Sequence, residues 1–191
     1  MLRHFKSKIM AGFAGAEAGA RFRLVSASVG GCFISLMSIG ALTWYFFPQT
    51  EHLLLMASFG SSAILIFTVP ELITAQPWPA IAGHVVAAVV GVFIRENAPL
   101  PHFAALALAV SLSLFLMFLT SSLHPPAGGT AIMALNVDGT LASYGYWLAL
   151  FPMASGMIIL VLLAAVYLNL VAGRRYPFRR SYSTVSVEPQ D

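Results

Sequence analysis

Charged residues are scarce in this 191-residue chain. They make up 9% of the sequence, whereas about a quarter of the residues in a soluble domain are charged. Hydrophobic residues make up 59%, and a soluble domain of this length could not bury so much apolar surface. The single cysteine, Cys32, excludes an intrachain disulfide and any cysteine spacing typical of a metal site. No phosphate-binding loop, serine-nucleophile motif or zinc signature occurs in the sequence. The composition predicts an integral membrane protein that needs no cofactor and is not an enzyme.

The few basic residues are concentrated at the two ends of the chain. Nine of the ten Lys and Arg residues lie before Leu24 or after Gly173. Basic segments beside membrane helices usually stay in the cytoplasm, so we expect both termini there and an even number of crossings. A basic folded face, which nucleic-acid binding requires, is absent from the sequence. We predict three regions: a cytoplasmic or interfacial amphipathic segment at 1–23, a transmembrane domain at 24–173 and a cytoplasmic tail at 174–191.

Six apolar segments follow one another between the tails. They cover about 24–47, 53–69, 79–94, 102–119, 124–137 and 146–171. A spanning helix needs about 20 apolar residues, so the fifth segment is too short to cross as one helix. The sequence therefore predicts an all-α polytopic transmembrane bundle. Four helices cross if the second and fifth segments are re-entrant, and six cross if each of them continues through the membrane.

The second and fifth segments resemble each other in their small residues. Gly60-Ser61-Ser62 in one corresponds to Gly128-Gly129-Thr130 in the other, and a loop with one acidic residue follows each. We predict two weak repeats, each with a broken or re-entrant short helix, although chance similarity of small residues is an alternative. Paired interrupted segments in two halves are typical of a transporter's binding site, and inverted halves favour six crossings.

The fifth segment, "TSSLHPPAGGTAIMAL", combines helix breakers with a histidine. Pro125 and Pro126 cannot continue a helix, and a new helix near Gly128 would begin with free N–H groups. Such groups attract anions, which predicts a small inorganic anion as the partner. His124 can hydrogen-bond an anion or shuttle a proton, or it can simply fix the bend through backbone carbonyls.

Two residues outside these segments complete the predicted site. His84 is either a ligand or the partner in a structural hydrogen bond, and Gln76 either reaches the cavity or caps the following helix. The predicted substrate-binding residues are His124, Pro125, Pro126, Gly128, Gly129, Thr130, Gly60, Ser61, Ser62, Gln76 and His84.

Three stretches carry a resemblance to a known family. "SSLHPPAGGTAIMAL", "SFGSSAILIF" and "AQPWPAIAGHVV" together resemble the HPP family of integral membrane proteins, over roughly residues 20–172. The family is named for its His-Pro-Pro motif, which matches His124, Pro125 and Pro126. Family members often have Gly-Ala-Ser or Gly-Ala-Thr where this chain has Gly60-Ser61-Ser62 and Gly128-Gly129-Thr130.

The resemblance implies four transmembrane helices and, by analogy with members from chloroplasts and cyanobacteria, nitrite transport. We therefore expect a transporter or channel for a small inorganic anion, with nitrite as the first candidate. The expected location is the bilayer of a bacterial cytoplasmic (inner) membrane, where a homo-oligomer could shield the broken segments from lipid. The alternatives are a channel for a small neutral solute, or a non-transport membrane subunit or enzyme built around His84 and His124.

Overall fold

The computed structural model describes residues 18–178 apart from Pro48. Within these residues the fold is all-α, without strands, as predicted. The helices are α2 (Ala18–Phe46), α3 (Gln49–Thr68), α4 (Pro77–Asn97), α5 (His102–Leu119), α6 (Gly128–Asn136), α7 (Gly139–Ser143) and α8 (Ser155–Leu170). Short turns η1 (Ile73–Ala75), η2 (Pro125–Ala127), η3 (Gly145–Ala149) and η4 (Leu150–Ala154) join them. Most of the predicted amphipathic segment, residues 1–17, and the distal tail, 179–191, lie outside the described residues.

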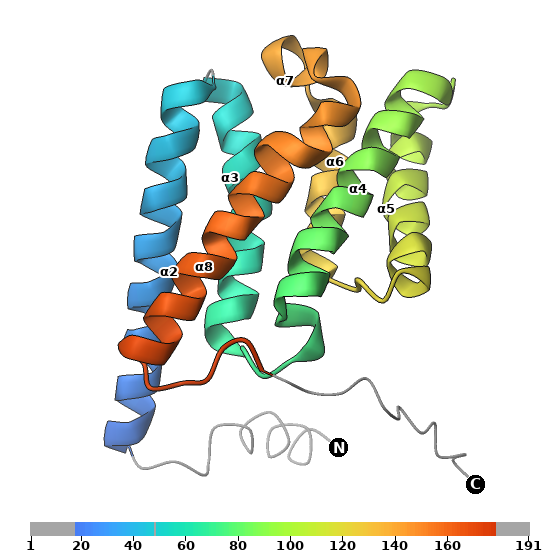
Figure 1. The fold of residues 1–191 in the computed structure, drawn as a ribbon. Coiled ribbons are helices and arrows are strands. Elements are labelled where there is room, and N and C mark those ends of the chain that lie inside the picture. Colours follow the sequence, from blue (N-terminus) through green and yellow to red (C-terminus); the bar gives the residue numbers. More distant parts are fainter. Residues whose placement is uncertain (1–17, 48, 179–191) are drawn as a thin grey trace, which may run out of the picture.

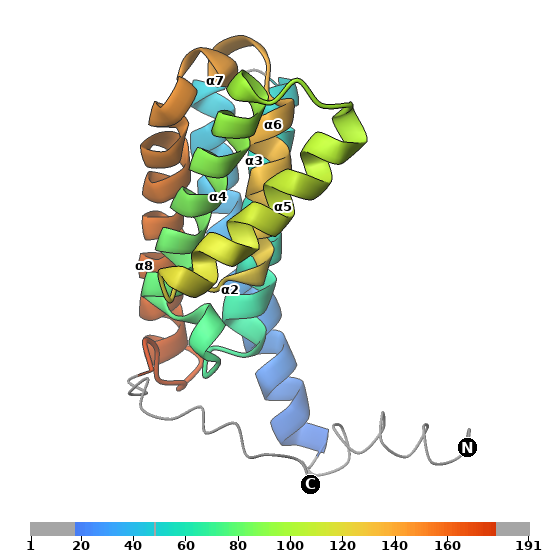
Figure 2. The same ribbon diagram turned by 90° about the vertical axis from the view of Figure 1, so that its right-hand side faces the viewer.

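The long helices run alternately in opposite directions. In Figures 1 and 2, α2, α4 and α6 run one way and α3, α5 and α8 run the other, so the described chain begins and ends at the same end of the bundle. Four helical stretches in the described part are long and apolar enough to cross a membrane: Phe22–Phe46, Pro77–Asn97, His102–Leu119 and Gly145–Leu170. Helix α3 and the short α6 pack between these four stretches and supply two of the four polar side chains of the buried site described below, Ser62 and Thr130.

The predicted break at Gly60 is wrong. Helix α3 runs without interruption from Gln49 to Thr68. Its serines fit a regular helix because a hydroxyl can donate to a carbonyl of the preceding turn; Ser61 Oγ does so to the Ser58 carbonyl, at 3.0 Å. In the other half a new helix does begin at Gly128, directly after the two prolines. The prediction of two equivalent broken helices therefore fails in the first half and holds only in the second.

Close contact between α4 and α6 places the centre of the bundle. A Cβ atom on Gly91 of α4 would lie 2.6 Å from the Ala131 carbonyl oxygen and 2.7 Å from the Ala134 Cβ on α6. About two helical turns earlier in α4, a Cβ on Gly83 would lie 2.8 Å from the Ser122 carbonyl oxygen. Membrane helices commonly use small residues to bring their backbones this close. The two glycines therefore fix the position of α6 and of the loop that precedes it.

Alanine substitutions at Gly91 and at Gly60 should change the stability in opposite directions, because Gly91 is packed against α6 and Gly60 faces open space. Gly91→Ala should lower the free energy of unfolding by about 1–3 kcal/mol, because the new methyl group overlaps the backbone of α6. Gly60→Ala is the matched control, since no atom lies within 4 Å of its added Cβ and alanine favours a helix interior by about 0.5–1 kcal/mol. Reversible unfolding in detergent would measure both. A loss of stability in Gly60→Ala would contradict a continuous α3.

Candidate functional site

Polar groups from separate segments form one hydrogen-bonded row inside the bundle, which we call the histidine chain. Thr130 Oγ1 of α6 lies 2.6 Å from His84 Nδ1 of α4, and His84 Nε2 lies 2.8 Å from Ser62 Oγ of α3. Ser62 Oγ lies 3.0 Å from His124 Nε2, and His124 Nδ1 lies 2.6 Å from the Thr74 carbonyl oxygen. The four side chains have 0% exposure. The histidine chain therefore crosses the interior of the bundle from α6 to the connection between α3 and α4.

The Thr74 carbonyl sets the direction of the histidine chain. A carbonyl oxygen only accepts hydrogen bonds, so Nδ1 of His124 carries the proton and, in a neutral ring, Nε2 is the acceptor. Ser62 then donates to His124 and accepts from Nε2–H of His84, whose Nδ1 accepts from the Thr130 hydroxyl. This assignment satisfies both imidazoles in their neutral form. All four hydrogen bonds then point the same way, toward Thr74.

The local sequence explains why His124 lies beside α4. Pro125 and Pro126 stop any continuation of α5, and His124 adopts an extended backbone (φ −135°, ψ 95°) immediately before η2. On the facing helix, a Cβ at Gly83 would lie only 2.9 Å from the His124 Cβ, so glycine is needed for this approach. The result brings the ring centroids of His84 and His124 to 5.3 Å.

The N–H groups expected to be free at the start of α6 are largely used. The N–H of Ala127 donates to the His124 carbonyl at 2.9 Å, and the N–H of Gly128 donates to carbonyls of the two prolines. The prolines themselves have no N–H. Two of the N–H groups at this helix start are therefore engaged. The polar side chains near it are those of the histidine chain and Ser58, whose buried Oγ has no hydrogen-bond partner among the described residues.

The predicted site residues separate into two groups. The structure brings His84, His124, Ser62 and Thr130 together in the buried histidine chain. The remaining small residues and prolines lie around it: Gly60, Pro126 and Gly128 are half-buried, and Ser61, Pro125 and Gly129 are exposed.

Gln76 lies outside the histidine chain. Its Nε2 donates to the Pro70 carbonyl at 2.7 Å, and its Oε1 accepts from the N–H of Phe178 at 2.7 Å. The side chain therefore fixes the loop between α3 and α4. Gln76 occupies the N-cap position of α4, but its side chain makes no capping hydrogen bond there. It lies instead next to the C-terminal segment.

A C-terminal strap, residues 173–178, contacts η1. Tyr176 is buried, and its hydroxyl donates to the Ala75 carbonyl at 2.9 Å. Burial raises the pKa of Tyr176, so the phenol stays a donor. The neighbouring Thr74 carbonyl accepts from His124. Two adjacent carbonyls of η1 thus accept hydrogen bonds, one from His124 and the other from Tyr176.

Arg174 fastens the start of the strap to the end of α3. Its guanidinium donates to the Phe67 carbonyl at 3.2 Å and to the Glu71 carboxylate at 2.7 Å. Partial burial of Glu71 opposes ionisation, but the hydrogen bond and charge of Arg174 hold the pKa of its carboxyl below the ordinary value. Sequence reasoning treated 174–191 as a free tail and missed this contact. The aromatic residues of "RRYPF" were the one available signal.

The histidine chain is poorly suited to a metal ion. Among residues 18–178 no group of three or more His, Cys, Asp or Glu side chains is placed to bind one. Each nitrogen of His84 and His124 already has a hydrogen-bond partner. The arrangement can instead pass hydrogen bonds, and with them a proton, along its length.

The assignment of tautomers predicts a specific NMR result. In nitrogen NMR of the isotopically labelled protein at neutral pH, His124 should carry its proton on Nδ1 and His84 on Nε2. In Ser62→Ala the signals of both rings should shift, because each loses the partner of one nitrogen. Ser61→Ala, which alters the exposed neighbouring serine, should leave them unchanged. A His124 protonated on Nε2 alone would contradict the direction of the chain.

Comparisons with known proteins bear on the whole described region. The family model described as "HPP, transmembrane region" matches residues 17–177. Two Dictyostelium discoideum proteins, each named only as a transmembrane protein, are 35% identical over 150 residues and 43% identical over 129 residues. The matches cover 76% and 64% of this chain, and 47% and 44% of those relatives, so the chain spans about half their length. No solved structure matches.

Proposed function

The chain belongs to the HPP family of transmembrane proteins, and we propose that it carries a small inorganic anion across the membrane, with nitrite as the first candidate. The observation that carries this proposal is the buried, fully hydrogen-bonded histidine chain between α3, α4 and α6. The relatives' names indicate a membrane location only. The choice of substrate therefore rests on the chemistry of the histidine chain and on the resemblance in the His-Pro-Pro motif. A bacterial inner membrane stays a prediction.

The charges around the histidine chain favour an anion over a cation. Glu71, Glu96 and Asp138 are exposed and make no contact with it. Intramembrane carboxylates usually mark the path of a cation or a proton pump. The polar groups of the chain are hydroxyls and imidazoles, which donate hydrogen bonds to oxyanions. Ser62 and Thr130 each donate to an imidazole, but both hydroxyls have 0% exposure and have no substrate-accessible face in this arrangement, so we favour transport over catalysis.

Two neutral imidazoles do not balance the charge of an anion in an apolar interior. An unpaired buried charge is costly, so the anion would enter together with a proton. A proton arriving at Nε2 of His124 turns that nitrogen from an acceptor into a donor and releases the Ser62 hydroxyl. The site then holds one cation and one anion and stays neutral overall. We therefore propose electroneutral movement of the anion with a proton.

Transport requires the bundle to open. The four side chains of the histidine chain have 0% exposure, so solvent does not reach them in this arrangement. The segment most suited to move is η2 with α6, a nine-residue helix that follows broken backbone and carries Thr130. Discontinuous helices near the centre of a bundle typically form the substrate sites of transporters.

Uptake by proteoliposomes tests this proposal. The purified protein should accelerate nitrite uptake above the rate of protein-free liposomes, which report diffusion of the free acid. Uptake should rise as pH falls and should not respond to an imposed membrane potential. His124→Gln keeps a donor for the Thr74 carbonyl but cannot be protonated, so it should lose the protein-dependent uptake and with it the rise at low pH. His102→Gln, an exposed position at the start of α5, is the matched control.

Three outcomes would contradict the proposal. Nitrite uptake equal to that of protein-free liposomes would exclude transport of this anion and favour a non-transport subunit. Faster passage of glycerol than of nitrite, nitrate or formate would favour the neutral-solute alternative. Uptake that follows the membrane potential would show that no proton accompanies the anion.

A further inference from the structure

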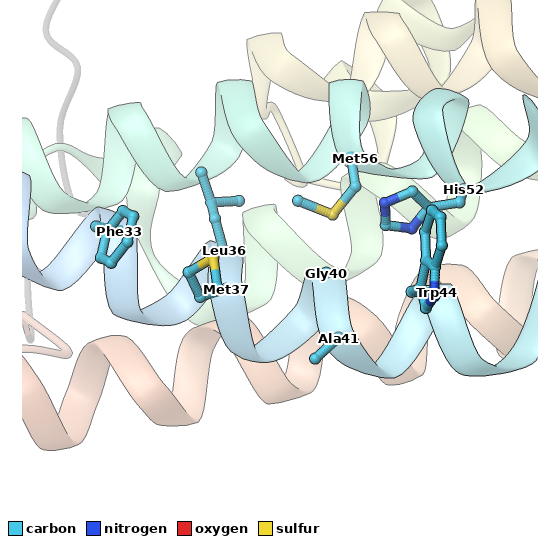
Figure 3. A pocket seen from close by; sticks show the side chains of 8 residues that line it. All are labelled: Phe33, Leu36, Met37, Gly40, Ala41, Trp44, His52 and Met56. Atoms are coloured by element: carbon cyan, nitrogen blue, oxygen red, sulfur yellow. The ribbon is translucent and has the colours of Figure 1, made fainter. Parts of the chain in front are cut away.

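A groove between α2 and α3 lies apart from the histidine chain. It has a volume of about 400 Å³ and is lined mainly by apolar side chains of the two helices, with His52 as its polar end (Figure 3). We propose that this groove binds one bilayer lipid with a free hydroxyl in its headgroup. The hydroxyl donates a hydrogen bond to His52, and the hydrocarbon chain lies along α2.

The floor of the groove is shaped for a chain of methylene groups. Gly40 and Ala41 leave space on α2, and a Cβ added to Gly40 would meet only the flexible end of Met56, at 3.5 Å. Phe33 and Leu36 continue the apolar lining toward the middle of the helix. Only 17% of the apolar window of α2 is buried within the chain, which leaves most of this helix free to contact lipid.

The hydrogen bonds of His52 define what it can bind. Thr43 Oγ1 lies 3.0 Å from the Ile39 carbonyl and 3.2 Å from the Gly40 carbonyl, so its single proton is directed to its own helix. The Thr43 oxygen therefore accepts from His52 Nδ1, 2.8 Å away. With the proton on Nδ1, Nε2 is left as the acceptor of the ring. In Figure 3 one ring nitrogen of His52 points along the groove toward Met56.

The place of His52 suits a headgroup. It lies in the first turn of α3, next to the connection from α2, at one end of the bundle (Figure 1). The ring of Trp44 meets it edge-on, with centroids 5.5 Å apart, and Trp44 is 61% exposed. Tryptophan beside a polar group is typical of the membrane–water boundary. A lipid hydroxyl reaches Nε2 here, whereas a choline headgroup has no proton to donate.

Quenching of Trp44 fluorescence tests the proposal. In a Trp78→Phe, Trp147→Phe background, Trp44 is the one remaining tryptophan of the sequence. The protein would be placed in phosphatidylcholine vesicles containing either a brominated fatty alcohol or its methyl ether, which has the same tail and no donor. The alcohol should quench half of the Trp44 fluorescence at a roughly three- to tenfold lower mole fraction than the ether does, because only the alcohol can donate a hydrogen bond to His52.

Two variants separate the headgroup from the tail. His52→Phe should abolish the difference between alcohol and ether, whereas His102→Phe, outside the groove, should keep it. Gly40→Leu should fill the floor and reduce quenching by both probes. Equal quenching by the two probes in the parent, or a difference that persists in His52→Phe, would overturn the proposal. So would protection of Trp44 from both probes that disappears when the protein is diluted in the bilayer, because a second copy would then cover the groove.

Discussion

The carbonyl oxygen of Thr74 accepts the Nδ1–H of His124, and the polar interior of the bundle depends on this bond. Since a carbonyl cannot donate, the bond selects one tautomer for His124 and makes its other nitrogen an acceptor. Ser62 and His84 then have one consistent arrangement each, and the row ends at Thr130. A polar row without this end point would have two equivalent directions. With it, the proposed route carries a proton from Thr130 to His124.

Two sets of contacts fix the positions of the two ends of the histidine chain. On one side, the side-chain-free surfaces of Gly83 and Gly91 let α6 and the preceding loop touch the backbone of α4, which sets the spacing between His84, Thr130 and His124. On the other side, the strap bonds η1 through Tyr176. Any movement that opens the row has to loosen one of these contacts. The strap therefore ties the C-terminal segment mechanically to the site.

The sequence predicted what proline and hydropathy dictate, and failed where packing decides. Pro125 and Pro126 remove N–H groups and exclude helical backbone, so the break before Gly128 followed directly from the residues. Gly60 and its serines only permit a break, and the surrounding apolar residues kept α3 continuous. The joining of His84 to His124 spans 40 positions and depends on the contact of α4 with the loop, which no local pattern contains. The hydrogen bond from Tyr176 to the Ala75 carbonyl also joins residues that are distant in the sequence, so it could not be predicted for the same reason.

The most direct test of the histidine chain as a carrier of anion and proton together is a simultaneous measurement of both fluxes. Proteoliposomes loaded with a pH-sensitive dye would receive a nitrite gradient at zero membrane potential, and the initial rates of nitrite and proton entry would be compared after subtraction of protein-free liposomes. The structure predicts equal rates in the parent protein and loss of both together in His124→Gln. Nitrite entry without matching proton entry, or equal rates that survive in His124→Gln, would contradict it.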